Sequence, residues 1–221
     1  MAGADRVFHL AAWYRIGRGE PATAEAVNVD GTRNVLELVD ELDLARAVYT
    51  STLAGNSDTA GRLVDESYRF EGEHLSVYDR TKWRAHYEVA EPMAEAGLPL
   101  VTVMPGVLYG PGDTSDLGGT VRRYLRGKLP AIAEGVTGID APRAVPPGVF
   151  AGLSRVAGVA ERAVRLPATY SAETLRVLAG VTCLGDNAKA TRELGIEHRP
   201  FEEGFAETLE YELGRLDERA D

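Results

Sequence analysis

VFHLAA, residues 7–12, is a short apolar run that ends in small side chains, and it predicts a buried β-strand. Similar apolar runs at residues 47–49 and 100–104 predict two more strands. Between them, the residue patterns of 21–42 and 78–96 predict helices. Strands that alternate with helices of this length predict an α/β fold with a parallel sheet buried on both faces, whose functional groups gather beyond the carboxyl ends of the strands.

The composition argues against several classes of protein. No apolar run approaches the ~20 residues of a membrane-spanning helix, and the N-terminal residues lack a signal pattern, so we expect a cytoplasmic protein with no membrane partner. Cys183 is the single cysteine and the four histidines are scattered, so we expect no disulfide framework and no metal site. The formal net charge of -10 opposes binding to nucleic acid.

The residues with the clearest chemical meaning are Tyr78 and Lys82, in the stretch YDRTK. Side chains four residues apart lie on one face of a helix. A free phenol has a pKa of ~10, and a nearby ammonium lowers it, which would make Tyr78 a usable proton shuttle. The alternative is an ordinary exposed pair on an amphipathic helix. The hydroxyl cluster at residues 50–52, TST, favours the catalytic interpretation because it follows the preceding strand and could hold a substrate oxygen beside the phenol.

Five motifs in order along the chain carry a resemblance to a known family. They are residues 5–12, residues 28–34, the strand end at residues 50–52, the pair at 78 and 82, and PGVLYGPG at residues 105–112. In this order they resemble the extended short-chain dehydrogenases/reductases, the NAD-dependent epimerase/dehydratase family. Within this family, the sequence around residues 49–52 and 126–131 looks most like the dihydroflavonol-reductase-like and hopanoid-associated sugar-epimerase branch.

The resemblance implies a role for each matching residue. Tyr78 would be the general acid/base, Lys82 would lower its pKa and bind the nicotinamide ribose of NAD or NADP, and Thr52, rather than Ser51, would orient the reacting oxygen. Asn28 would support a water relay near Lys82. The residues expected to border the cofactor are Ala11, Ala12, Pro105 and Val107, and those expected near the substrate are Trp13 and Tyr14.

Several of these residues have a structural alternative. Ala11 and Ala12 could be small core residues, Asn28 could be a hydrogen-bonded asparagine within a helix, and Trp13 and Tyr14 could pack under a loop. For His9, inside an apolar strand, a structural role is expected.

The resemblance also implies an incomplete Rossmann-like sheet, because a glycine-rich pyrophosphate loop normally follows the first strand and nothing before Val7 can supply it. We expect a shortened chain with a second gap between Gly135 and Asp140. The predicted domains are residues 1–139, a partial cofactor and catalytic domain, and residues 140–221, a reduced and mainly helical substrate-domain remnant with segments near 171–179, 186–194 and 201–216.

The predicted function is that of an NAD(P)-dependent oxidoreductase or epimerase acting on a carbinol or carbonyl carbon of a nucleotide-sugar-like or small carbonyl substrate. The resemblance also disfavours dehydration: dehydratases of the family follow the catalytic threonine with acidic residues, whereas Leu53 and Ala54 follow Thr52 here. The competing interpretation is a non-catalytic remnant or binding module with little cofactor affinity. By analogy with the family, the helices at residues 21–42 and 78–96 could form a homodimer.

Overall fold

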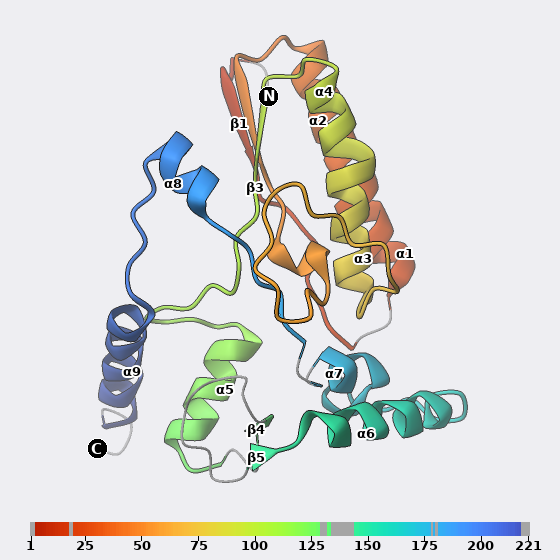
Figure 1. The fold of residues 1–221 in the computed structure, drawn as a ribbon, viewed down its shortest axis with the longest axis vertical. Helices are drawn as coiled ribbons and strands as arrows, with labels where there is room; N and C mark the ends of the chain where they lie inside the picture. The colour runs from red at the N-terminus through yellow and green to blue at the C-terminus, as the bar shows by residue number, and fades with distance from the viewer. Residues whose placement is uncertain are drawn as a thin grey trace. The chain divides into compact units, whose positions relative to one another are not determined.

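The computed structural model describes residues 3–17, 20–128, 132–133, 144–177, 179 and 181–217. The chain forms two compact units, and each is built from two segments (Figure 1): residues 1–106 with 146–186, and residues 107–145 with 187–221. The predicted gap between Gly135 and Asp140 and the predicted domain boundary after residue 139 lie outside the described residues. Because the segment 146–186 joins the first unit, the units interleave along the chain, and the division into a catalytic and a substrate domain stays a prediction.

The first unit contains a parallel sheet in the order β1-β2-β3. Its strands are β1 (Arg6–His9), β2 (Arg46–Thr50) and β3 (Leu100–Val103). His9 lies opposite Tyr49, and Thr50 lies opposite Val103, so the carboxyl ends of all three strands meet at one edge. The predicted α/β fold with a parallel sheet is therefore confirmed, although β1 ends three residues before Ala12, the end of the predicted run.

Two long helical runs pack on this sheet (Figure 1). The first consists of α1 (Pro21–Glu25), the π-helical segment η1 (Ala26–Asp30) and α2 (Gly31–Glu41). The second consists of α3 (Val77–Arg84), the π-helical segment η3 (Ala85–Ala90) and α4 (Glu91–Glu95). Both match the predicted helices. Each contains a π-helical segment, a feature that is frequent at functional sites because it redirects side chains within a helix.

The main core lies between these helices and one face of the sheet. Its largest fully buried members include Tyr49, Leu36, Val29 and Val39. Phe8, by contrast, is 69% exposed, because its side chain points to the face of β1 opposite His9 and the core. The prediction that the strands are buried on both faces is therefore wrong for this residue in the described part of the chain.

The first unit also contains several shorter helical elements. After β2 comes the single turn η2 (Leu53–Asn56), and later in the chain come α6 (Pro147–Ala160), η4 (Ala168–Tyr170) and α7 (Ala172–Val177). α6 and α7 share a small apolar core that contains Ala157 and Leu175. Gly185 approaches Val64 in an isolated parallel bridge, which ties residues after α7 to the loop between η2 and α3.

The second unit contains α5 (Asp116–Leu125), the short parallel strands β4 (Ile132–Ala133) and β5 (Ala144–Val145), α8 (Ala188–Leu194) and α9 (Phe201–Asp217). Of the described residues after 145, most lie in helices, and the assignment of 140–221 to a substrate-domain remnant stays a prediction. An ion pair at 3.1 Å between Arg122 of α5 and the buried carboxylate of Glu212 joins α5 to α9.

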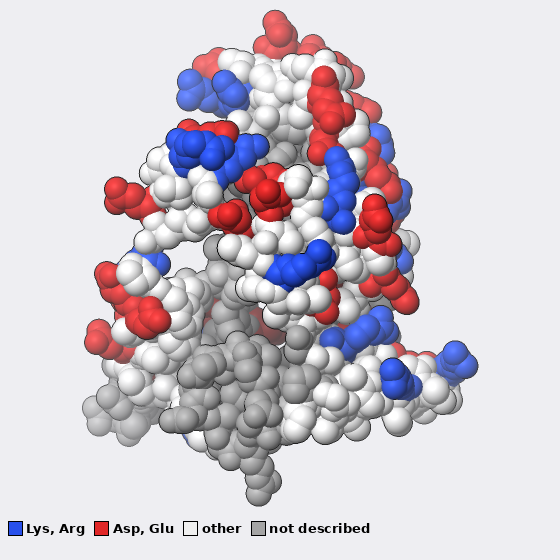
Figure 2. All heavy atoms as spheres, viewed as in Figure 1, with Lys and Arg blue, Asp and Glu red and all other residues white. Residues whose placement is uncertain are grey.

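The surface of the first unit carries both signs of charge. Figure 2 shows acidic and basic side chains interspersed along the side where α3 and α4 run. Arg84 pairs with Glu25 and Glu88, and Arg69 pairs with Glu91. Exposed pairs of this kind contribute about 0–1 kcal/mol each. Among the described residues, no helix is long and apolar enough to cross a membrane.

Leu36 and Leu38 on α2 give a matched test of the core. Leu36 is fully buried and Leu38 is 40% exposed. We expect Leu36→Ala to lower the free energy of unfolding by about 2–5 kcal/mol, because it removes buried methyl groups and leaves a cavity, whereas Leu38→Ala should cost less than about 1 kcal/mol. Urea unfolding followed by circular dichroism measures both. Equal losses in the two variants would contradict the packing described for α2.

Candidate active site

The start of α3 is fixed by a local cap. The backbone N–H of Asp79 donates to the Ser76 hydroxyl at 3.0 Å, and the same hydroxyl donates to the Asp79 carboxylate at 2.6 Å. This reciprocal arrangement gives the Asp79 amide, which has no partner inside the helix, a hydrogen-bond acceptor. It starts the helix immediately before Tyr78, so Tyr78 and Lys82 lie one turn apart on the same face.

Lys82 ties this helix to the sheet. Its side chain is only 2% exposed, and its ammonium donates to the carbonyl of Thr50, the last residue of β2, at 2.8 Å. The ammonium also lies 4.7 Å from the ring centre of Tyr49, a favourable cation–π distance. Burial lowers the pKa of Lys82 to about 8, because a charged group loses hydration inside the protein. Lys82 is thus a buried amine that titrates near physiological pH.

Tyr78 lies beside Thr52, as the sequence predicted. Burial raises the pKa of Tyr78 above its usual value, hydrogen bonding to the Thr52 side chain lowers it, and the nearby Tyr14 and Asp79 raise it. The net shift is upward, and Lys82 is not among the causes. The role of Lys82 in lowering the pKa of Tyr78 stays a prediction, and the upward shift has another origin. The physical reason is that desolvation of the phenol dominates, while the ammonium is directed at the Thr50 carbonyl.

The three hydroxyl residues that follow β2 have different partners. Thr52 accepts a hydrogen bond from the backbone N–H of Ala54 at 3.2 Å and caps η2. Ser51 is buried, and its hydroxyl lies 3.0 Å from Nδ1 of His86. Burial lowers the pKa of His86 to about 4, so this imidazole is neutral at physiological pH. Of Ser51 and Thr52, Thr52 is the one whose side chain contacts Tyr78, and its role in orienting the reacting oxygen stays a prediction.

Asn28 is buried in the π-helical segment η1 and is engaged through its amide. Its Oδ1 accepts from the backbone N–H of Trp13 at 2.7 Å, and its Nδ2 donates to the Trp13 carbonyl at 3.0 Å and to the Thr81 hydroxyl at 2.9 Å. Asn28 therefore connects the chain after β1 with α3. Its side chain fits the structural alternative, and a role in a water relay stays a prediction.

The predicted substrate residues behave differently from each other. Trp13 is buried, with only 8% of its surface exposed. Tyr14 is 54% exposed, and its ring meets the ring of Tyr78 edge-on, with 4.8 Å between ring centres and an interplanar angle of 79°. This geometry is favourable for aromatic pairs. Of the two, Tyr14 is thus the residue in contact with the candidate acid/base.

The predicted cofactor residues follow the carboxyl ends of β1 and β3. Ala11 and Ala12 are exposed, so they are not small core residues. Pro105 is half-buried, and its carbonyl accepts from the backbone N–H of Leu53 at 3.1 Å. Val107 is 78% exposed and belongs to the second unit. Their contact with a cofactor stays a prediction.

Two neighbours of the site have structural or electrostatic roles. The His9 side chain is 3.0 Å from the Thr32 hydroxyl and stacks on Tyr49, consistent with the structural role expected for it. Asp79 was not predicted as a site residue, although the spacing Ser-x-x-Asp is a helix-start signal. Burial raises its pKa to about 6, its hydrogen bond to Ser76 lowers it, and the charge of Glu173 raises it.

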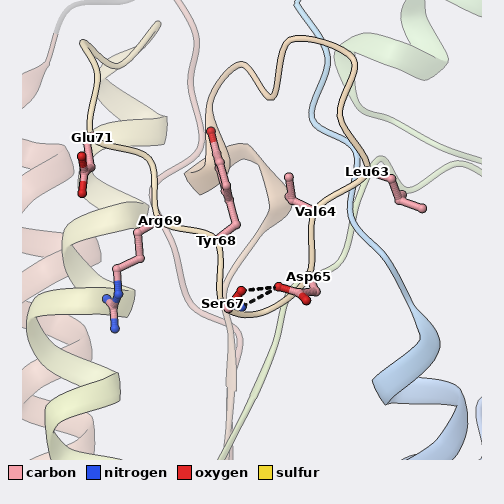
Figure 3. A pocket seen from close by; sticks show the side chains of 7 residues that line it. All are labelled: Leu63, Val64, Asp65, Ser67, Tyr68, Arg69 and Glu71. Carbon is pink, nitrogen blue, oxygen red and sulfur yellow. Dashed lines mark hydrogen bonds between the residues drawn. The ribbon is translucent and has the colours of Figure 1, made fainter.

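A hollow of about 570 Å³ opens elsewhere, in the loop between η2 and α3 (Figure 3). Its floor includes Asp65, whose carboxylate accepts from the backbone N–H of Ser67 at 3.0 Å and from its hydroxyl at 2.6 Å. None of the predicted site residues lines it. The lining residues are Leu63, Val64, Asp65, Ser67, Tyr68, Arg69 and Glu71. Among the described residues, no group of three His, Cys, Asp or Glu side chains is arranged to hold a metal ion.

Comparison with known proteins identifies the family. The model of the NAD dependent epimerase/dehydratase family matches residues 1–138, which is more than half of the chain. The chain belongs to the NAD-dependent epimerase/dehydratase family. This confirms the resemblance found in the sequence, and the family description agrees with the expected nicotinamide cofactor.

Members of the epimerase/dehydratase family and related enzymes share about a third of the aligned residues. A "Putative dihydroflavonol 4-reductase" from Synechocystis is 34% identical over 135 residues, which cover 59% of this chain and 39% of that protein. The human 3 beta-hydroxysteroid dehydrogenase type 7 is 35% identical over 122 residues, which cover 51% of this chain and 33% of that protein. The matched region is thus a minority of each relative's length.

Solved structures share the fold of this family member. The crystal structure of gox2253 superposes with a TM-score of 0.72 at 22% identity, covering 95% of this chain and 78% of that one. UDP-glucose 4-epimerase from Thermotoga maritima superposes with a TM-score of 0.60 at 21% identity, covering 96% and 78%. At these identities the likeness establishes the Rossmann-like fold.

Asp79 provides a pH test of the site. A carboxyl group whose pKa is about 6 when folded and ~3.9 when unfolded favours the folded state at low pH, and this contribution is lost as the pH rises through 6. Asp79→Asn keeps an acceptor for Ser76 and does not titrate. Its stability relative to the wild type should therefore increase by on the order of 1 kcal/mol between pH 5 and pH 7.5.

Urea unfolding at the two pH values measures this difference. Because the histidines are the same in both proteins, their own pH dependence cancels in the comparison. Asp40→Asn, at an exposed position on α2, is the control and should show no such trend. A difference between Asp79→Asn and wild type that stays constant or falls with pH would show that Asp79 is not a buried, raised-pKa carboxyl.

Proposed function

We propose that this chain is an NAD(P)-dependent oxidoreductase or epimerase that acts on a carbinol or carbonyl carbon through Thr52, Tyr78 and Lys82. The observation that carries the proposal is the interaction of the Tyr78 phenol with the Thr52 hydroxyl, one helical turn from a buried lysine and at the carboxyl edge of a parallel sheet. Ligands of open α/β sheets bind beyond this edge. Membership of the family supports the same reaction class.

The chemistry of Lys82 fits a nicotinamide cofactor. An ammonium has three N–H donors, and among the described residues its one hydrogen-bond acceptor is the Thr50 carbonyl. A buried ammonium with donors to spare suits the hydroxyls of a ribose. The exposed Ala11 and Ala12 after β1, and Pro105 after β3, would border the cofactor, and Val107 is proposed with them from the resemblance. When bound, the cofactor supplies or accepts a hydride at C4 of its nicotinamide ring.

The residues of the chain would handle the proton that accompanies hydride transfer. Because the pKa of Tyr78 is raised, its phenol is protonated at neutral pH and is suited to donate to a carbonyl oxygen as that oxygen becomes a hydroxyl. Thr52 would hold the same oxygen through its own hydroxyl. In the reverse direction, Tyr78 would have to lose its proton before accepting one from the substrate.

The substrate class follows from the residues after Thr52 and from the relatives. Leu53 and Ala54 supply no second acid or base, which disfavours elimination of water. The sequence relatives named above are a reductase and a hydroxysteroid dehydrogenase, and these support oxidation or reduction at a secondary alcohol more than epimerisation. A nucleotide-sugar-like substrate remains the alternative, supported by the fold shared with UDP-glucose 4-epimerase.

A specific observation also favours a second function, that of a non-catalytic remnant or binding module with little cofactor affinity. In the described part of the chain, β1 is followed by Leu10 and Ala11, and β2 by Ser51 and Thr52, rather than by a glycine-rich turn. A pyrophosphate normally rests on such a turn and on the helix N-terminus behind it. Ribose and nicotinamide contacts alone give weak affinity.

Titration of the purified chain with NADH and NADPH separates the two functions. We expect saturable enhancement of nicotinamide fluorescence, and we expect Lys82→Met to weaken it because the buried amine is lost. Tyr78→Phe should keep cofactor binding but reduce turnover of secondary alcohols or ketones by about 100-fold or more, since it removes the proton donor. Tyr170→Phe, which changes a 64% exposed tyrosine, is the matched control. Absence of binding at millimolar cofactor would favour the remnant.

A further inference from the structure

The segment of residues 13–17, which follows β1 and carries Tyr14, is held at both of its ends. At its first end, the backbone of Trp13 exchanges two hydrogen bonds with the side chain of Asn28, at 2.7 and 3.0 Å. The same amide reaches Thr81 on α3. The first tie therefore links this segment, through Asn28, to the helix that carries Tyr78.

The second tie comes from Glu173, at the start of α7. One oxygen of its carboxylate accepts from the backbone N–H of Gly17 at 3.0 Å, and the other accepts from the backbone N–H of Val77 at 2.8 Å. Val77 is the first residue of α3 and directly precedes Tyr78, so its N–H has no partner within the helix. Hydrogen bonds to an ionised carboxylate are roughly twice as strong as neutral ones.

The packing around Gly17 supports a close and specific approach. Gly17 has a φ of +73°, a conformation that favours glycine. A Cβ atom at this position would lie 2.4 Å from the hydroxyls of Ser171 and Thr174, which flank Glu173 in the sequence. A second contact joins α7 to the start of α3, because Arg176 donates to the Leu75 carbonyl at 3.5 Å.

We propose that Glu173 is a positioning residue of the Tyr78 site: its carboxylate fastens residues 13–17 to the first turn of α3 and so holds the ring of Tyr14 against Tyr78. Tyr14 lies between the two hydrogen-bonded ends of this segment. Its ring meets the ring of Tyr78 edge-on, and about half of its surface is accessible to a ligand. Glu173 acts through Tyr14 and does not itself touch the phenol. We call the two hydrogen bonds from the Glu173 carboxylate to the amides of Gly17 and Val77 the clamp. Its catalytic role rests on the proposed function of Tyr78, but the presence of the clamp can be tested without turnover.

The clamp determines the surroundings of the phenol. The groups that influence Tyr78 are Thr52, Tyr14 and Asp79, and the largest influence is burial. Release of residues 13–17 would withdraw Tyr14 and admit water to the phenol. Tyr78 would then titrate at lower pH, closer to an ordinary tyrosine, and a substrate would lose one wall of its site.

The test uses Glu173→Ala, Glu173→Gln and the matched control Glu161→Gln. Gln keeps the shape of the side chain, but its NH₂ cannot accept, so one of the two amide bonds is lost. Glu161 also accepts a backbone N–H at the start of α7, from Ala172 at 3.3 Å, but it contacts neither Gly17 nor Val77. The control therefore perturbs α7 without opening the clamp.

Two NMR readouts are compared in the full chain. The first is amide hydrogen exchange at Gly17 and Val77, which should accelerate at least about tenfold in Glu173→Ala, at one or both amides in Glu173→Gln, and not in Glu161→Gln. The second is the titration of Tyr78 in protein with labelled tyrosine, assigned with Tyr78→Phe. Its midpoint should fall by at least half a pH unit in the Glu173 variants and stay unchanged in the control.

Faster exchange together with a shifted Tyr78 titration supports the proposal, even if the chain shows no turnover and the proposed function fails. Unchanged exchange at both amides overturns the clamp. Faster exchange with an unchanged Tyr78 titration overturns the positioning role, because Glu173 would then be a purely structural contact. If Glu173→Ala does not fold, the Glu173→Gln variant decides between these outcomes by the same two measurements.

Discussion

The bond from the buried ammonium of Lys82 to the carbonyl of Thr50 is the contact on which the arrangement of the site depends. It joins the middle of α3 to the carboxyl end of β2, and thereby fixes the distance between the helix that carries Tyr78 and the strand end that carries Thr52. Burying an amine costs hydration, and the lowered pKa of Lys82 reflects that cost. The cation–π contact with Tyr49 offsets part of it. A lysine held in this way leaves donors for a ligand at the sheet edge.

Several other hydrogen bonds position the rest of the site relative to the contact between Lys82 and Thr50. Ser76 caps the first turn of α3, and Asn28 bridges Trp13 and Thr81. Glu173, which is 96 residues away from Val77 in the sequence, accepts a hydrogen bond from the Val77 amide at the start of α3. Backbone groups at a helix start and in a loop after a strand have no regular partners, so side chains must satisfy them. The same bonds that satisfy these groups also determine where Tyr14 and Tyr78 meet.

The raised pKa of Tyr78 changes the chemical interpretation of the Tyr-x-x-x-Lys pair. Spacing on a helix places an amine near a phenol, but it does not decide whether Coulomb attraction or loss of hydration prevails. Here the phenol packs against Tyr14 and is partly removed from water, while the amine is directed elsewhere. Here loss of hydration prevails. A phenol with a raised pKa stays protonated at neutral pH.

The sequence by itself determined the order and type of the elements in the first unit. Apolar runs predicted β1, β2 and β3, helical periodicity predicted the runs α1–α2 and α3–α4, and the four-residue spacing placed Tyr78 and Lys82 on one face. These features are local, because hydrogen bonding and side-chain period within a single segment decide them. The order of the five motifs along the chain also indicated the family, and the match to the family model confirmed it.

Only the tertiary structure decided the direction of the Lys82 amine, the upward pKa shift of Tyr78, the exposure of Phe8 and the tie between Glu173 and the amides of Gly17 and Val77. Each of these depends on groups far apart in the chain that meet through packing. Glu173 gave no local signal at all, because a lone glutamate at the start of a short helix is ordinary. Its carboxylate joins two distant segments, and a linear pattern does not encode which distant backbone amides a half-buried side chain will reach.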